Sequence, residues 1–218
     1  NWTGVYVGVL GFCSNKKVLD ERGLAVPESW SDLLKPELKG QVSTAHPSTS
    51  GTAFTTLWTQ VVLGGSENAG IDYMKKMHAN VLQYTKSGTA PGQIAGRGEV
   101  AVGLVFSHDC VKYRDEGMKD LVVSFPKEGT GYEIGGVALI KNSKHSEAAK
   151  KYIDWAISAD AQNIGQTVGS NQILTNPNAK TNDKMAKLDE INLIDYNFAA
   201  AAAAKPELTK RFDEEVAA

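Results

Sequence analysis

The chain has 218 residues, of which 42% are apolar and 22% are charged, and its formal net charge is −2. This composition is usual for a globular protein of one or two domains. Because the two signs of charge are mixed along the chain, we expect neither binding to nucleic acid nor electrostatic attachment to an anionic membrane. No apolar run approaches the roughly 20 residues needed to span a bilayer.

The first part of the chain predicts a strand, a short helix and a second strand. Residues 4–12 (GVYVGVLGF) place valine at alternate positions among other apolar residues, which is typical of a strand buried on both faces. Ser29 is a candidate N-cap for a short helix that stops ahead of Pro36. Residues 40–45 then predict a short strand.

An amphipathic helix follows, and strands and helices alternate after it. Its apolar face carries Phe54, Leu57, Trp58, Val61 and Val62, and it ends at Gly64 and Gly65. Further strands are expected over residues 80–85, 99–106, 121–126 and 135–141. Further helices are expected over residues 69–78, after Ser146, after Ser158, and from the alanine run Ala199–Ala204 to the end. This alternation predicts an α/β fold with a largely parallel sheet.

The two cysteines, Cys13 and Cys110, have no histidine or cysteine at the spacing of a zinc site. Cysteine behaves as a small apolar residue, which favours two buried free thiols. A single disulfide in an oxidising compartment is the open alternative.

The segment HPSTSGTA (residues 46–53) collects hydroxyl groups immediately before a helix, where backbone N–H groups are unpaired and the helix dipole is positive. The hydroxyl donors are Ser48, Thr49, Ser50 and Thr52, and Gly51 leaves space beside the backbone. We expect this helix start to bind a phosphate, phosphonate, carboxylate or carbonate, with an ordinary N-cap beside a turn as the alternative. The lysine of a nucleotide-binding GxxxxGK[ST] loop is missing, so nucleotide hydrolysis is not expected.

Two further predicted strand ends carry polar residues. Ser87 and Gly88 follow one strand, and His108 and Asp109 directly follow the next. Because ligands in open α/β sheets bind outside the carboxyl ends of strands, we expect these loops to face one cleft. A histidine donates to an anion, an aspartate accepts from hydroxyls or an amine, and the two together are possible metal ligands. The alternatives are an ordinary turn for Ser87 and Gly88 and a helix cap for His108 and Asp109.

The linker over residues 126–136 is a further source of site residues. We expect Glu128, Tyr132 and Glu133 to reach the cleft, with a solvated turn as the alternative. Neither a GxSxG nor an HExxH motif occurs. A hydrolytic enzyme that uses His108 and a pair of these carboxylates is therefore only a third hypothesis.

Three segments taken together resemble the extracytoplasmic solute-binding proteins of bacterial ABC importers, in the branch that binds ferric iron, phosphorylated sugars and phosphonates. They are PESWSDLLKPELKGQVSTAHPSTSGTA, YTKSGTAPGQIAGRGEVAVGLVFSHD and PKEGTGYEIGGVALIKNSKHSEAAKKYIDWAISADAQ. The resemblance covers about residues 1–175 and implies a type 2 periplasmic-binding-protein fold, in which two α/β lobes close on a ligand.

The resemblance also implies a division of the chain, in which one lobe is complete and the other is partial. Residues 15–125 would form the second lobe, residues 1–14 and 126–180 the crossover strands with the remainder of the first lobe, and residues 181–218 a C-terminal helical segment packed on the second lobe. The chain would be a fragment without the N-terminal part of lobe one, so that apolar surface is uncovered.

The family's partners and location follow from the same resemblance. It implies an ABC permease as partner, a periplasmic or extracytoplasmic location with the signal segment absent from this chain, no cofactor and no catalysis. Contact with a membrane would arise only through the permease or a removed lipid anchor.

The family's site residues are carried over by motif. Ser50, Gly51 and Thr52 match the anion-binding helix start, and Ser87 and Gly88 match a second ligand loop. His108 and Asp109 stand where iron-binding members carry adjacent tyrosines, and Glu133 is a further candidate by position. Since no phenolate stands there, we expect a small anionic organic ligand, a sugar phosphate or phosphonate. A ferric ion held by His108 and Asp109 is the second hypothesis.

Overall fold

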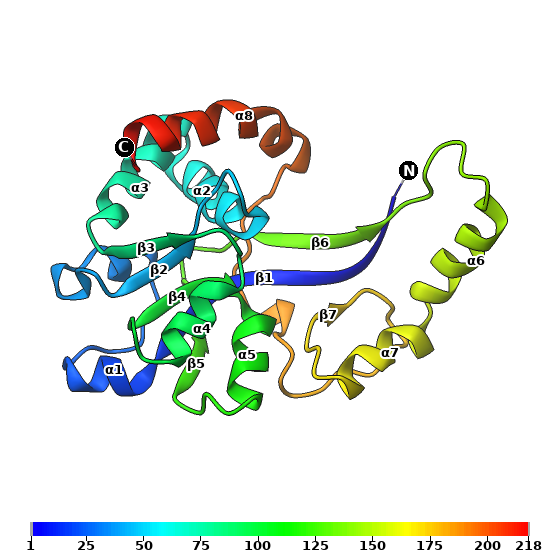
Figure 1. The fold of residues 1–218 in the computed structure, drawn as a ribbon, viewed down its shortest axis with the longest axis horizontal. Coiled ribbons are helices and arrows are strands. Elements are labelled where there is room, and N and C mark those ends of the chain that lie inside the picture. Colours follow the sequence, from blue (N-terminus) through cyan, green and yellow to red (C-terminus); the bar gives the residue numbers. More distant parts are fainter. Residues whose placement is uncertain (1, 218) are drawn as a thin grey trace.

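A computed structural model describes residues 2–217, which form a seven-stranded sheet with helices around it (Figure 1). The strands are β1 (Thr3–Asn15), β2 (Val42–Ala45), β3 (Val81–Thr85), β4 (Val102–Phe106), β5 (Leu121–Ser124), β6 (Tyr132–Val137) and β7 (Ile173–Leu174). The helices are α1 (Lys16–Glu21), α2 (Gly51–Gly64), α3 (Glu67–His78), α4 (Ala90–Gly96), α5 (Ser107–Asp115), α6 (Ser146–Ala156), α7 (Ala159–Thr167) and α8 (Phe198–Glu215). Short 3₁₀ turns lie at Trp30–Leu34, Pro36–Leu38 and Leu188–Glu190.

The sheet is mixed, so the prediction of a largely parallel sheet is wrong. Its order is β3-β2-β4-β1-β5, with β6 and β7 paired to β1. Among the strands of residues 2–217, only the β2–β3 and β2–β4 pairs are parallel, and β1 is antiparallel to β4, β5, β6 and β7. Alternation of strands and helices predicts the class of the fold, but it does not reveal that one long strand runs against the others.

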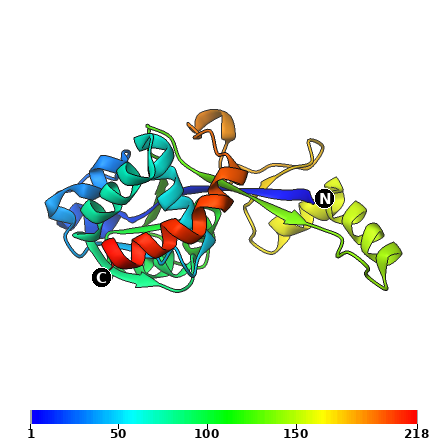
Figure 2. The ribbon, with the colours of Figure 1, turned by 90° about the horizontal axis from the view of Figure 1, so that it is seen from above.

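Strand β1 connects two parts of the molecule. Its second half is buried between β4 and β5, whereas its first half is partly exposed and pairs with β6. Burial on both faces was therefore predicted correctly only for the second half. Figures 1 and 2 show β1 and β6 running side by side from the larger body, which holds α1–α5 and α8, to a smaller group of α6, α7 and β7.

The main apolar core fixes the position of α2. Phe54, Leu57, Trp58 and Val61 are buried as predicted, and Gly65 ends the helix with a left-handed φ of 73°. The alanine run begins α8, which packs on α2 and α3 through Leu208 and Phe212 (Figure 2). The predicted C-terminal helix is thus confirmed, and it packs on the larger body.

Cys13 and Cys110 form a disulfide, so the expectation of two free thiols is wrong. Their Cα atoms are 5.5 Å apart, although 97 positions separate them in the chain. Both belong to a second, smaller apolar cluster beneath α4 and α5. Burial was predicted correctly, but pairing depends on the proximity of α5 to β1, which composition does not reveal.

Strand β6 begins earlier than predicted, at Tyr132 rather than residue 135. Gly135 and Gly136 lie within the strand, whereas Gly129 and Gly131 precede it. A Cβ built on Gly135 would collide with the ring of Tyr6 on β1, so the strand pair needs glycine there to admit the ring.

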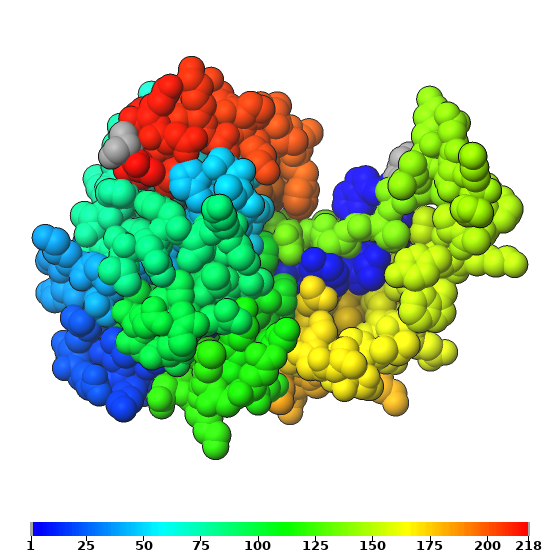
Figure 3. All heavy atoms as spheres, in the orientation of Figure 1, coloured from blue at the N-terminus to red at the C-terminus, as the bar shows by residue number. Residues whose placement is uncertain are grey.

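Large apolar side chains are exposed on the smaller group. On α6 and α7 and in the turn after α7 they are Tyr152, Trp155, Ile164 and Val168. Figure 3 shows an open notch above β6, between the start of α8 and the segment that leads to α6. Among residues 2–217, no helix combines the length and the apolar character that crossing a bilayer requires.

Candidate functional site

Three strand ends meet at one edge of the sheet, as the sequence predicts. β3, β2 and β4 are neighbours and run parallel, so their carboxyl ends lie on the same side (Figure 1). β2 leads to the start of α2, β3 to the start of α4, and β4 directly to α5. Helix N-termini with unpaired N–H groups therefore gather at this edge.

The start of α2 combines a cap with an open approach. Ser50 is the N-cap, and its Oγ accepts a hydrogen bond from the N–H of Ala53 at 3.4 Å. Gly51 is exposed, and a Cβ built on it would have no atom within 4 Å. Thr52 is half-buried beside it. Gly51 and Thr52 are the first residues of α2, so their backbone N–H groups have no partner within the helix and lie near two hydroxyl groups.

The loop before α4 packs directly on this helix start. A Cβ at Gly88 would collide with Oγ1 of Thr52 and would lie 2.7 Å from Oγ of Ser50. The hydroxyl of Thr49 donates to the carbonyl of Lys86 at 3.1 Å, which ties the two loops together. We call Ser50, Gly51, Thr52 and Gly88 the anion cradle.

Ser87 and Ser48 lie at the rim of the cradle. Ser87 is exposed, and its hydroxyl lies 3.0 Å from Oγ1 of Thr89. Ser48 is also exposed, and its hydroxyl lies 2.7 Å from Nδ1 of His46. Nε2 of His46 in turn lies 3.2 Å from a carboxylate oxygen of Asp213 on α8. Both hydroxyls therefore have partners within the protein.

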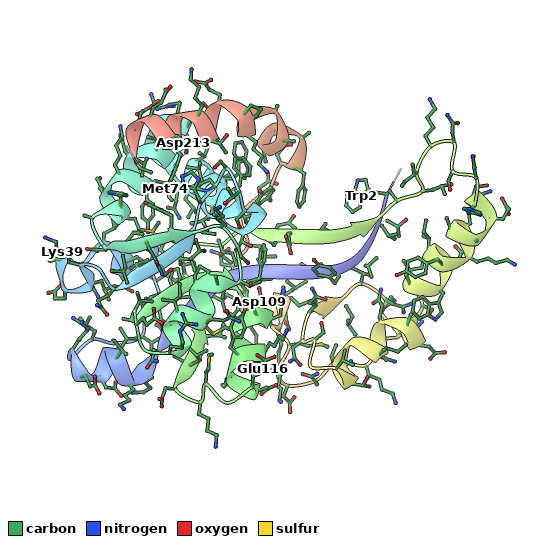
Figure 4. All side chains as sticks on the ribbon, in the orientation of Figure 1. Trp2, Lys39, Met74, Asp109, Glu116 and Asp213 are labelled. Carbon is green, nitrogen blue, oxygen red and sulfur yellow. A yellow bond between two sulfur atoms is a disulfide. The ribbon has the colours of Figure 1, made fainter. Side chains whose placement is uncertain are left out.

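His108 and Asp109 lie in the first turn of α5, both half-buried. In Figure 4, Asp109 and Glu116 mark the two ends of α5, and Asp109 is at the end next to β1. The ring of His108 stacks on Phe106 with centroids 5.9 Å apart. Burial lowers the pKa of His108 to about 4, so this imidazole is neutral at neutral pH. Its 3.8 Å approach to the Asp109 carboxylate is therefore not an ion pair at that pH.

Burial also raises the pKa of Asp109 to about 6, although the charge of Lys112 opposes the shift. The carboxyl group is still mainly ionised at pH 7. It is a hydrogen-bond acceptor held in a partly desolvated position.

Gly8 of β1 lies beneath His108 and Glu133. In the strand register Gly8 is opposite Glu133 on β6. A Cβ on Gly8 would be 3.0 Å from Cε1 of His108 and 3.3 Å from Oε1 of Glu133. His108 and Glu133, which are 25 positions apart in the sequence, therefore lie close together over β1. We call His108, Asp109 and Glu133 the acidic end of the site.

Tyr6 is a further site residue that the sequence did not indicate. Its hydroxyl donates to Oε1 of Glu133 at 3.4 Å, and its ring lies edge-on to His108. Burial raises the pKa of Glu133, the Tyr6 hydrogen bond lowers it, and the charge of Asp109 raises it further. Since Tyr6 lies inside an apolar strand, only the register of β1 against β6 reveals its role.

A cavity of about 190 Å³ opens between α5 and the turn after α7. It is lined by His108, Asp109, Lys112 and residues 168–172. Asn171 and Gln172 therefore join the neighbourhood of the site, and no motif marked them. A larger cavity, of about 500 Å³, lies between α5, β5 and residues 183–191 and contains none of the predicted site residues.

The prediction that Glu128 reaches the cleft is wrong. Its carboxylate accepts hydrogen bonds from the hydroxyl of Ser29 and from the N–H of Trp30, so it holds the first 3₁₀ turn. Tyr132 packs against the rings of Tyr196 and Phe198. Within residues 2–217, no group of three His, Cys, Asp or Glu side chains is arranged to hold a metal ion.

Comparison with known proteins gives one family. Residues 1–202 match the family described as bacterial extracellular solute-binding protein. The periplasmic binding protein AfuA from Actinobacillus pleuropneumoniae, solved with exogenous fructose-6-phosphate bound, superposes with a TM-score of 0.92 at 37% identity. That match covers 99% of this chain and 68% of the AfuA chain.

Two curated relatives are similar in sequence. An uncharacterized protein of Haemophilus influenzae is 39% identical over 98% of this chain, and the Fe(3+)-binding periplasmic protein of Serratia marcescens is 24% identical over 88%. This chain spans 62% of the Haemophilus protein and 56% of the Serratia protein.

Proposed function

Because the chain belongs to the bacterial extracellular solute-binding proteins, we propose that it captures a sugar phosphate or a phosphonate for delivery to an ABC permease. The fold is the α/β fold of type 2 periplasmic binding proteins, as the sequence resemblance implied. The observation that carries the proposal is the placement of the anion cradle and the acidic end at the same edge of the sheet.

The cradle suits a phosphate group. It offers backbone N–H groups at the positive end of α2 and hydroxyl groups from Ser50 and Thr52, with no carboxylate among its residues. Gly51 leaves the helix start open, so that an oxygen of the ligand approaches the backbone closely.

The acidic end suits the hydroxyl groups of a sugar. The carboxylates of Asp109 and Glu133 accept hydrogen bonds, and the neutral ring of His108 either donates or accepts. A ligand with a phosphate at one end and hydroxyls at the other satisfies both sets of groups. The fructose-6-phosphate bound to AfuA has this chemistry, which supports the proposal.

The test is calorimetric titration with fructose 6-phosphate. Replacing Ser50→Ala together with Thr52→Ala should weaken binding by about 1–3 kcal/mol, because hydrogen bonds to a charged group are lost. Ser66→Ala is the matched control, since Ser66 caps α3 by the same bond to a backbone N–H and lies outside the cradle. Equal affinities in the double variant and the control would contradict the proposal.

A ferric ion with a bound anion is the second candidate, supported by the Serratia relative. His108 and Asp109 would be its ligands. Protein incubated with ferric citrate and then desalted would retain iron, which elemental analysis detects. We expect no retained iron, and we expect fructose 6-phosphate to be bound without release of inorganic phosphate, as for a binding protein rather than a hydrolase.

The proposed place of action is outside the cytoplasm, which the periplasmic location in the names of its relatives supports. Release to the permease would follow a shift between open and closed lobes, with residues 15–125 as one lobe. This division and the identity of the permease belong to the proposal.

A further inference from the structure

The helices that begin at the two ends of the candidate site bury residues in different apolar cores, although Phe106, on which His108 stacks, belongs to the main core. The cradle begins α2, whose buried residues Phe54 and Leu57 belong to the main core. His108 and Asp109 begin α5, whose buried residues Cys110 and Tyr113 belong to the smaller cluster. A change in the smaller cluster should therefore move one end of the site more than the other.

The disulfide links that smaller cluster to the floor of the site. Cys110 directly follows Asp109, and Cys13 lies in β1 with its register partners Gly103 on β4 and Val123 on β5. Both cysteines are at most 1% exposed. Five residues from Cys13 along the same strand, Gly8 lies beneath His108 and Glu133. The covalent bond thus connects the turn that carries two site residues with the strand beneath them.

Helix α5 packs on β1, β4, β5 and α4, and the disulfide is the covalent restraint among these contacts. The helix has nine residues, and its N-cap, Phe106, makes no side-chain capping bond. Helices of this length are marginal without tertiary contacts. The cradle has an independent restraint, because Gly88 packs on Ser50 and Thr52 and α2 is anchored in the main core.

From these contacts we infer that the Cys13–Cys110 disulfide is a positioning element for the acidic end, and that it acts on recognition of the ligand's hydroxyl groups but not on the cradle. The inference rests on the proposed function. If the disulfide positions the acidic end, its reduction changes the selectivity of the site. A phosphate group is still bound, while the preference for a sugar phosphate over inorganic phosphate falls.

The experiment measures the affinities of fructose 6-phosphate and of inorganic phosphate, the latter by competition, for the wild type and for Cys13→Ala combined with Cys110→Ala. We expect the double variant to lose about tenfold in affinity for fructose 6-phosphate, the equivalent of one weakened hydrogen bond to a charged group. Its affinity for inorganic phosphate should stay unchanged. If the double variant fails to fold, the wild-type chain provides the same comparison without a substitution, after reduction with dithiothreitol in urea, which exposes the buried sulfur atoms, and refolding in the same reductant.

Leu208→Ala is the matched control for lost stability. Leu208 is fully buried in the main core on α8, away from α5, so this variant should unfold more easily and keep the wild-type ratio of the two affinities. A changed ratio in Leu208→Ala as well would overturn the inference, since any loss of stability would then have the same effect.

Other outcomes separate this inference from the proposed function. A wild type that binds no fructose 6-phosphate would contradict the proposed function. In another case the wild type binds fructose 6-phosphate, while the double variant and the reduced chain keep the wild-type ratio of the two affinities or lose affinity for both ligands equally. This result would leave the proposed function intact and overturn the positioning role of the disulfide. Failure of inorganic phosphate to compete in the wild type would also overturn it, because the two ends would not act separately.

Discussion

Burying a charged side chain in the site costs free energy in the ligand-free protein, and hydrogen bonds from a bound ligand can offset that cost. Asp109 is half-buried, ionised at pH 7 and offset only by Lys112, so its carboxylate is poorly solvated in the ligand-free protein. The presence of His108 and Asp109 was predictable from the strand end in the sequence. The contribution of Tyr6 was not, because an aromatic residue within an apolar strand reads as core.

We predict that Asp109→Asn stabilises the ligand-free protein at pH 8, by about 1–3 kcal/mol. The folded-state pKa of Asp109, about 6, is above its ordinary value of 3.8. The native state therefore binds the proton more tightly, and the stability contributed by this group is lost as the pH rises from about 4 through 6. The advantage of the variant should fade over the same range on acidification.

Urea unfolding of both proteins at pH 8 and pH 4 checks this prediction, with Asp72→Asn, an exposed change on α3, as the control. The same Asp109→Asn variant should bind fructose 6-phosphate more weakly, because an acceptor of charged hydrogen bonds is replaced. A destabilised Asp109→Asn protein at pH 8 would show that the carboxylate is not desolvated.

At the scale of elements, the sequence predicted most helices and strands because their apolar periodicity is strong. Phe54, Leu57 and Val61 indicated the buried face of α2, and the hydroxyl-rich segment 48–52 indicated its start, where the structure has Ser50 as the N-cap. The direction of β1 was not predictable, since alternation of apolar residues is the same in parallel and antiparallel strands. β6 was placed too late because its glycines indicate turns, although they admit the ring of Tyr6.

The open start of α2 predicts that Gly51→Ala separates stability from binding. A methyl group at this position meets no protein atom within 4 Å, and alanine favours a helix over glycine. The melting temperature should therefore stay the same or rise, while the affinity for fructose 6-phosphate falls at least tenfold if the phosphate contacts this backbone. Thermal unfolding and calorimetry measure the two effects, and unchanged affinity would place the ligand elsewhere.

At the scale of the whole molecule, three chain segments run side by side between the larger body and the smaller group, and Thr130 joins them. Its hydroxyl donates to the carbonyl of Leu10 at 2.8 Å, and its N–H donates to the carbonyl of Asn192 at 2.9 Å. Its carbonyl accepts from the N–H of Ile194 at 3.0 Å. The sequence predicted the existence of crossover segments by resemblance, but it gave no indication that a single threonine connects them.

We predict that Thr130→Val lowers the free energy of unfolding by about 1–3 kcal/mol, because a fully buried hydrogen bond is lost at constant volume. Thr209→Val is the control, since its hydroxyl bonds only within the exposed surface of α8. Urea denaturation measures the free energy of unfolding of both variants. An equal loss in the two would mean that the hydrogen bond from Thr130 to Leu10 stabilises the fold no more than the one within α8.

The central claim is that the start of α2 and the acidic end hold the two ends of one ligand. A crystal structure of the protein with fructose 6-phosphate tests it most directly. We expect the phosphorus atom beside the N–H groups of Gly51 and Thr52, with sugar hydroxyls within hydrogen-bonding distance of His108, Asp109 or Glu133. A phosphate bound elsewhere on the surface, with the cradle filled only by water, would contradict the account.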